Sequence, residues 1–141
     1  MDPDTPHARS GYGPIFKSSP LLEALGGFYS RGRGADLAIG LRVDARHANS
    51  RGRLHGGVIA TLADTAIGYL LAYRDDPPTR LVTVSLSVDF VAAAKVGDWV
   101  DVTLDEASHT GRLVFASGRL QVEGRVLALA RAIFSKVADE R

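Results

Sequence analysis

The segment from Gly56 to Tyr73 most constrains how this chain of 141 residues can fold. It is apolar nearly all round, which is typical of a helix buried in a protein core. Polar or small residues at positions 57, 61, 64 and 68 are spaced by four, three and four, and so lie on one narrow stripe. Asp64 is the only carboxylate of the segment. An ionised carboxylate on such a helix is unfavourable unless it is paired, hydrated or used in chemistry, so Asp64 is the first candidate functional residue.

The composition indicates one globular domain with a real core, because 45% of the residues are hydrophobic. Seventeen basic and sixteen acidic side chains give a net charge of +1, which favours neither nucleic acid nor a membrane surface as a partner. The absence of cysteine excludes disulfides, a thiol nucleophile and a Cys-ligated zinc site. His7, His47 and His109 are scattered without metal-ligand spacing and are expected to be solvated, so we expect no metal and no cofactor.

Nothing in the sequence resembles a targeting or membrane segment. The first sixteen residues lack the basic-then-apolar order of a signal peptide. No window approaches the roughly 18 consecutive apolar residues of a transmembrane helix. A cytoplasmic protein is therefore the default expectation.

The order of the predicted elements favours an α+β fold. Residues 1–30 are expected to form an N-terminal arm with a short helix after Ser19-Pro20, and residues 31–141 the main domain. Alternating patterns predict strands at 35–43, 81–90, 99–107, 113–122 and 126–136. Strict alternation in 81–90 would put Thr83 and Ser85 on the face opposite Val82 and Leu86. One long buried helix wrapped by a curved antiparallel sheet of about five strands is the economical packing of these parts.

The start of the long helix is suited to binding a developing negative charge. Gly56 and Gly57 leave its N-terminal N–H groups accessible to an acyl group. Asp64 could act as a general base or as a nucleophile. It lies seven residues after Gly57, about 10 Å along the axis at ~1.5 Å per residue, which is too far for both to touch one carbon atom. If both act in one site, the carboxylate must come from a second chain, which predicts a dimer with two shared sites.

The spacing Asn49-x-x-Gly52-x-x-His55-Gly56-Gly57, with Asp64 seven residues further on, resembles the hot-dog fold acyl-CoA thioesterases of the phenylacetate-degradation (PaaI-like) and THEM2-like group. Turns at 95–98, 109–112 and 123–125 also fall where that family has similar turns. The resemblance extends from about Leu37 to Phe134. One departure is that Phe90 is followed by Val-Ala-Ala-Ala, where the family often has a proline.

The resemblance implies a role for each motif residue. The Gly57 N–H and the Asn49 side chain would polarise the thioester carbonyl, and His55 would lie close to the sulfur. Asp64 of the partner chain would orient or deprotonate water, with a hydroxyl from the next strand beside it. Thr83 falls at the matching position for that hydroxyl, ahead of Ser85. The substrate would be an acyl-CoA in a groove at the interface of a homodimer or homotetramer, lined by Gly56, Thr61 and Gly68.

Several alternatives remain open from the residues themselves. Asp64 could instead bond neighbouring hydroxyls, His55 could merely hydrogen-bond its loop, and Asn49 could be only a turn former. Loop arginines could meet the phosphates of coenzyme A or be only solvated; they are Arg46, Arg51 and Arg53. A hot-dog dehydratase or hydratase, and an acyl-CoA sensor without turnover, are the alternative functions.

Overall fold

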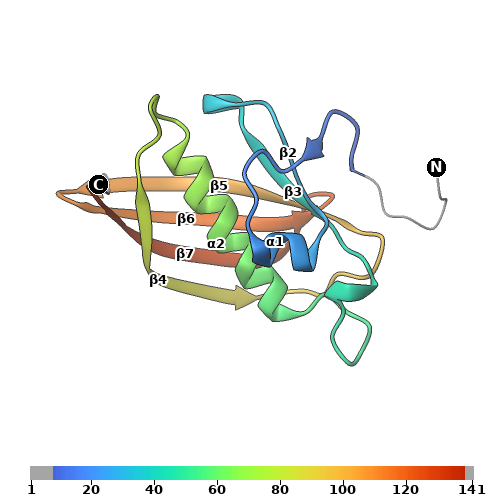
Figure 1. The fold of residues 1–141 in the computed structure, drawn as a ribbon. Helices are drawn as coiled ribbons and strands as arrows, with labels where there is room; N and C mark the ends of the chain where they lie inside the picture. Colours follow the sequence, from blue (N-terminus) through green and yellow to red (C-terminus); the bar gives the residue numbers. More distant parts are fainter. Residues whose placement is uncertain (1–7, 139–141) are drawn as a thin grey trace.

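The computed structural model describes residues 8–138. The elements in chain order are β1 (Gly13–Pro14), α1 (Pro20–Leu25), β2 (Phe28–Arg31), η1 (Gly34–Asp36), β3 (Ala38–Arg42), η2 (Ala45–His47), α2 (Gly56–Ala72), β4 (Leu81–Phe90), β5 (Trp99–Thr110), β6 (Leu113–Val122) and β7 (Arg125–Lys136). The two η elements are single 3₁₀ turns. Within the described chain, all seven strands form one antiparallel sheet in the order β1-β2-β3-β5-β6-β7-β4 (Figure 1).

The helix α2 lies across one face of this sheet, in front of β5, β6 and β7 in Figure 1. It contacts every strand from β3 to β7, so the sheet wraps around it. The helix residues that face the sheet are completely buried, and the core that they form includes Leu62, Ala63, Ala66, Ile67, Leu41, Val100, Leu120 and Phe134. Burial of this apolar surface is the main driving force for the fold. The predicted α+β architecture of one long helix inside a curved sheet is confirmed.

The sheet has two more strands than the sequence analysis predicts, and both lie before residue 32. The strand β2 pairs with β3 and the very short β1 pairs with β2, so the segment 13–31 extends the sheet. The helix α1 forms as expected, with the Ser19 side chain accepting a hydrogen bond from the Leu22 N–H at its start. The strand predicted at 35–43 begins only at Ala38, because the 3₁₀ turn η1 (Gly34–Asp36) takes up the first two positions of the predicted strand.

The strand β4 forms an edge of the sheet and contains a β-bulge. Its pairing with β7 shifts between Thr83 and Ser85, so that one residue, Val84, is extra. Thr83 pairs with the buried Phe134, and Leu86 pairs with the buried Ala132. These two therefore share the face that looks at α2, while Ser85 is on the outer face. The strict alternation predicted from the sequence is wrong here. The extra residue moves Thr83 from the face of Ser85 to the face of Leu86.

Candidate active site

The Asp64 carboxylate on α2 is held by the hydroxyl of Thr83 on β4. Thr83 Oγ1 donates a hydrogen bond of 2.6 Å to Asp64 Oδ1. This is the short distance expected for a hydroxyl bound to an ionised carboxylate. Asp64 is only half-buried and Thr83 is exposed. The pair thus presents an oriented carboxylate that a water molecule or a ligand can reach.

The N-terminus of α2 is capped by the histidine that precedes it. His55 Nδ1 accepts a hydrogen bond of 2.8 Å from the Gly57 N–H. The Gly56 N–H, one residue earlier, has no acceptor within its own helix and donates to no described residue. A Cβ at position 56 would lie 3.2 Å from the Phe90 ring, so glycine permits a close approach here. In the single chain, the available donor is therefore Gly56, whereas the sequence analysis assigned that role to Gly57.

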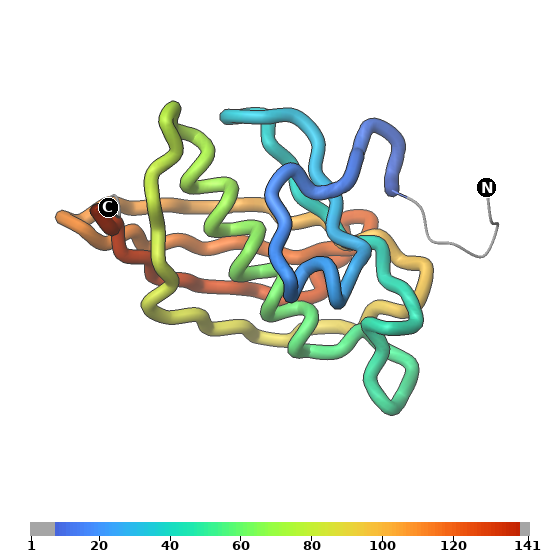
Figure 2. The backbone as a smooth tube through the Cα atoms, in the orientation of Figure 1, coloured from blue at the N-terminus to red at the C-terminus, as the bar shows by residue number. Residues whose placement is uncertain are grey.

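The segment between η2 and α2 forms a loop that projects away from the sheet (Figure 2), and Asn49 is part of this segment. Its Oδ1 accepts hydrogen bonds from the backbone N–H groups of Arg51, at 2.9 Å, and Arg53, at 3.1 Å. Such an Asx-type arrangement fixes the side chain against its own loop. The carbonyl end of the amide is thereby used, and Nδ2 is the end that can donate to a substrate.

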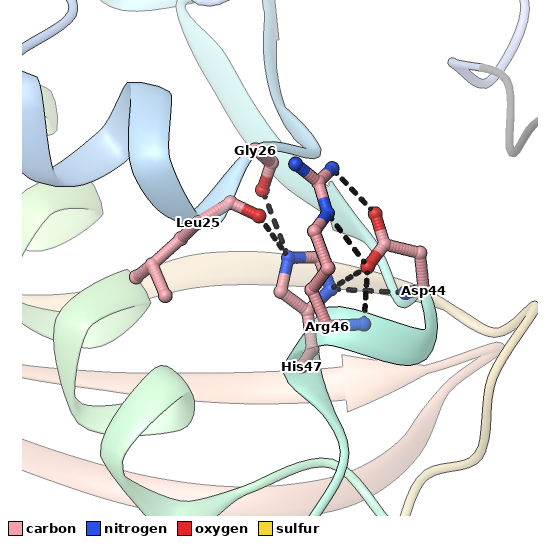
Figure 3. Close-up of polar contacts among 5 residues, drawn as sticks. All are labelled: Leu25, Gly26, Asp44, Arg46 and His47. Atoms are coloured by element: carbon pink, nitrogen blue, oxygen red, sulfur yellow. Dashed lines mark hydrogen bonds and ion pairs between the residues drawn. The ribbon is translucent and has the colours of Figure 1, made fainter.

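His47 is a fully buried connector between this loop and α1, as Figure 3 shows. Its Nδ1 accepts from the Asp44 N–H at 2.9 Å, so the ring hydrogen lies on Nε2, which is 2.9 Å from the carbonyl oxygens of both Leu25 and Gly26. Its backbone oxygen accepts the His55 N–H at 2.8 Å. The expectation that His47 is solvated is wrong, because the ring satisfies three backbone groups in the interior. His109 is exposed as expected, and His7 lies outside the described residues.

The turn that holds His47 is reinforced by an ion pair between Asp44 and Arg46. Arg46 donates to the Asp44 carboxylate from its backbone N–H at 2.8 Å and from its guanidinium at 2.8 Å (Figure 3). Burial raises the pKa of Asp44, but the hydrogen bonds from Arg46 outweigh it and hold the pKa below its ordinary value of 3.8. Arg46 is thus engaged within the turn, whereas Arg51 and Arg53 are exposed on the loop.

A pocket of about 460 Å³ adjoins the Asp64–Thr83 pair. Gly68 lies on its helix wall, and a Cβ there would lie 3.4 Å from the Phe134 ring. Thr61 is not among its lining residues, and its hydroxyl donates to the Gly57 carbonyl at 2.9 Å. Of the residues expected to line the substrate, Gly68 borders this pocket, Gly56 is at the start of α2, and Thr61 bonds its own helix.

Within one chain, the motif residues form two separate groups. Asp64 and Thr83 are together, as are His55 and Gly57, but seven residues of helix, about 10 Å, separate Asp64 from Gly57. Residues 8–138 contain no cluster of three or more acidic or histidine side chains that could hold a metal ion. In the same range, no helix is both long and apolar enough to cross a bilayer.

Known proteins resemble this chain over most of its length. A sequence profile described as the thioesterase superfamily matches residues 51–129. A provisionally named esterase of Pseudomonas aeruginosa is 42% identical over 125 residues, covering 88% of this chain and 93% of that protein. The mouse acyl-coenzyme A thioesterase 13 is 30% identical over 99 residues, covering 67% of this chain and 69% of that protein.

Solved structures share the fold. The PaaI protein of the phenylacetic acid degradation operon of E. coli aligns with a TM-score of 0.73 and 21% identity, covering 85% of this chain and 86% of that chain. A hypothetical thioesterase of Streptococcus pneumoniae, solved with coenzyme A, aligns with a TM-score of 0.72 and 20% identity, covering 85% of this chain and 93% of that chain. These likenesses confirm the fold that the sequence motifs predict.

Proposed function

The chain belongs to the thioesterase superfamily and is a thioester hydrolase, and we propose that its substrate is an acyl-CoA, hydrolysed to a free acid and coenzyme A. Two comparisons support this choice of thioester. One curated relative is an acyl-coenzyme A thioesterase, and one structural neighbour was solved with coenzyme A. The observation in this chain that carries the proposal is the Asp64–Thr83 hydrogen bond on the wall of a pocket.

In the proposed mechanism, the N-terminus of α2 stabilises the negative charge that develops on the thioester oxygen. The Gly56 N–H is positioned for this role because it has no helical acceptor, while the Gly57 N–H donates to His55. Asn49 Nδ2 would give a second hydrogen bond, since its Oδ1 is held by the loop. His55 stands beside these donors, close to where the sulfur would lie.

Asp64 would activate the attacking water or attack the carbonyl itself. As a base, it would take a proton from water while the oxygen of that water forms a bond to the carbonyl carbon. Collapse of the tetrahedral intermediate would then expel the thiolate of coenzyme A, which takes up a proton. As a nucleophile, Asp64 would attack the carbonyl carbon and expel the thiolate of coenzyme A, forming an anhydride that water then cleaves to the free acid and the Asp64 carboxylate. Thr83 would orient the carboxylate in either route through its 2.6 Å hydrogen bond.

The complete site requires two chains in this proposal. About 10 Å of helix separates Asp64 from the start of α2, so Asp64 would serve the helix start of a partner that runs antiparallel to it. The edge strand β4 supports such pairing, because every second one of its ten residues turns its backbone N–H and C=O groups away from β7, to the open side. Apolar side chains along it are exposed, with Val82 at 52% and Val84 at 59%. We propose a dimer joined through β4, or a tetramer built from two such dimers.

The direct test is hydrolysis of a panel of acyl-CoAs, comprising arylacetyl, aryl, short-chain and long-chain thioesters, with detection of the free thiol. At least one thioester should be cleaved with turnover. Asp64→Asn should lower kcat on the order of 10²–10⁴-fold while acyl-CoA binding is retained. Glu23→Gln, which removes an exposed carboxylate on α1, is the matched control.

Three results would contradict the proposal or part of it. Binding of acyl-CoA without release of thiol would indicate a sensor. Water loss from or addition to the acyl chain, with the thioester intact, would indicate a dehydratase or hydratase. Near wild-type turnover by Asp64→Asn would show that this carboxylate is structural.

A further inference from the structure

The pocket beside Asp64 runs along α2 from Asp64 to Tyr73. Two neighbouring rows of α2 form one wall, the first with Asp64, Gly68 and Ala72 and the second with Thr65, Tyr69 and Tyr73. From Asp64 to Tyr73 the helix rises about 13 Å, at ~1.5 Å per residue. Segments 78–83 and the end of β7 form the other wall. The small residues Gly68 and Ala72 leave room for an elongated group along this path.

The N-terminal segment contributes Lys17 to the far end of the pocket and packs against the tyrosines there. The Phe16 ring packs edge-on against Tyr69 and Tyr73, with centroid distances of 5.4 and 4.7 Å. The Phe16 N–H donates to the buried Ser30 Oγ at 3.0 Å, which ties this segment to β2. Lys17 follows directly, and its Nζ lies 6.0 Å from the centre of the Tyr73 ring. The anchored backbone and the contact with Tyr73 thus keep this ammonium group at the Tyr73 end of the pocket.

Charge is unequally distributed along the pocket. Its charged lining residues are Asp64 at the near end, and Lys17 and Arg80 at the far end. Arg80 is at the far end because the preceding residue, Thr79, is bonded to the end of α2. The Thr79 N–H donates to the carbonyl of Ala72 at 3.1 Å. Burial raises the pKa of Tyr69, although the charge of Lys17 lowers it, so that hydroxyl stays protonated and can donate. The far end thus offers positive charge and hydroxyl donors.

We propose that this pocket binds the acyl part of the substrate and favours an acyl chain that ends in a carboxylate, with Lys17 as the specificity-determining residue. The inference rests on the proposed acyl-CoA thioesterase function. With the thioester at Asp64, a chain of about 13 Å brings its end to Lys17, where a carboxylate is attracted. A short chain holds its carboxylate near Asp64, where the two negative charges repel.

The test compares kcat/KM for matched thioesters. Sebacyl-CoA and decanoyl-CoA have the same chain length and differ in a terminal carboxylate or methyl group. The ratio of their kcat/KM values should exceed one in the wild type. Lys17→Met should lower this ratio roughly fivefold, the upper range for a solvent-accessible ion pair, and Lys17→Glu should lower it further. Lys95→Met, a lysine outside this pocket, should leave the ratio unchanged.

A second pair controls for chain length. Succinyl-CoA and butyryl-CoA cannot reach Lys17, so their ratio should not respond to Lys17→Met. A sebacyl-to-decanoyl ratio within about twofold of wild type in both Lys17 variants would overturn the inference. The proposed thioesterase function would still stand in that case, provided that Asp64→Asn abolishes hydrolysis. Absence of hydrolysis for every acyl-CoA would instead reject the proposed function.

Discussion

Thr83 and Asp64 are 19 positions apart in the sequence, yet their side chains meet at 2.6 Å because β4 has one extra residue. In a strictly alternating strand, Thr83 would face away from α2, on the side of Ser85. The bulge at Val84 turns the hydroxyl towards the helix while Leu86 still reaches the core. A local irregularity of the strand thus creates the contact that orients the candidate catalytic carboxylate.

Removal of this hydroxyl should reduce turnover with little effect on substrate binding. Thr83→Val keeps the shape of the side chain but loses the hydrogen bond to a charged group, which is worth about 1.5–3 kcal/mol. We expect kcat to fall on the order of tenfold or more. Thr83→Ser keeps the hydroxyl and should stay within a few-fold of wild type. Equal losses in the two variants would show that packing at this position matters rather than the hydrogen bond.

Mixed dimers test whether the two groups of motif residues come from different chains. Asn49→Ala and Asp64→Asn homodimers should each be impaired, since every site lacks one group. A mixed dimer would combine both lesions in one site and leave the other intact. Co-expression should then restore up to about half of the wild-type rate per mixed dimer, if distant sites act independently. No recovery in mixed dimers verified by mass would contradict shared sites made of Asn49 and Asp64.

Lysines on the open edge should separate the chains. Ser87→Lys combined with Asp89→Lys places like charges along β4, where antiparallel pairing with a second copy would bring them together. We expect a folded monomer without thioesterase activity, measured by light scattering and circular dichroism. Glu106→Lys combined with Ser108→Lys makes the same changes in charge on β5, which pairs with β6 at these positions and lies away from the β4 edge, and should leave a dimer. A monomer that still hydrolyses acyl-CoA would contradict the two-chain site.

The Asp44 turn should make the free energy of unfolding depend on pH in the acid range. Because the pKa of Asp44 is lowered in the folded protein, its contribution is complete above the ordinary value of 3.8 and is lost as the pH falls below it. Asp44→Asn retains a side chain that can cap the turn but has no charge to lose. The difference in free energy of unfolding between wild type and Asp44→Asn should therefore be present near pH 7 and shrink towards pH 2.5. A constant difference over this range would refute the charge-based explanation.

Long, regular patterns made most of the fold predictable. The segment 56–73 gave a helix within one residue of α2, and the ends of β4 and β6 were predicted without error. Burial of one face imposes a period that these segments express strongly. The same spacing pointed to His55, now found at the start of α2, and to Asp64, found beside Thr83, whereas Asn49 bonds its own loop; the catalytic roles of all three remain predictions.

Short and tertiary features were not predictable. The strand β2 has four residues between glycine-containing loops, too few to show an alternating pattern. The burial of His47 depends on carbonyl groups of Leu25 and Gly26, which only the folded chain brings to its ring. Likewise, the hydrogen bond from the Gly57 N–H to His55 depends on the rotamer that the His55 side chain adopts in the folded chain. None of these contacts leaves a periodic signal in the sequence.

The place of β4 also matters while the polypeptide is being made. It leaves the ribosome well before β7, the one described strand that pairs with it, so for a time both of its sides are open. After β7 has docked, one side still offers a template to any extended peptide nearby. A new chain is therefore most prone to aggregate through β4 before β7 has docked, and soluble yield should rise when fewer chains are synthesised at the same time.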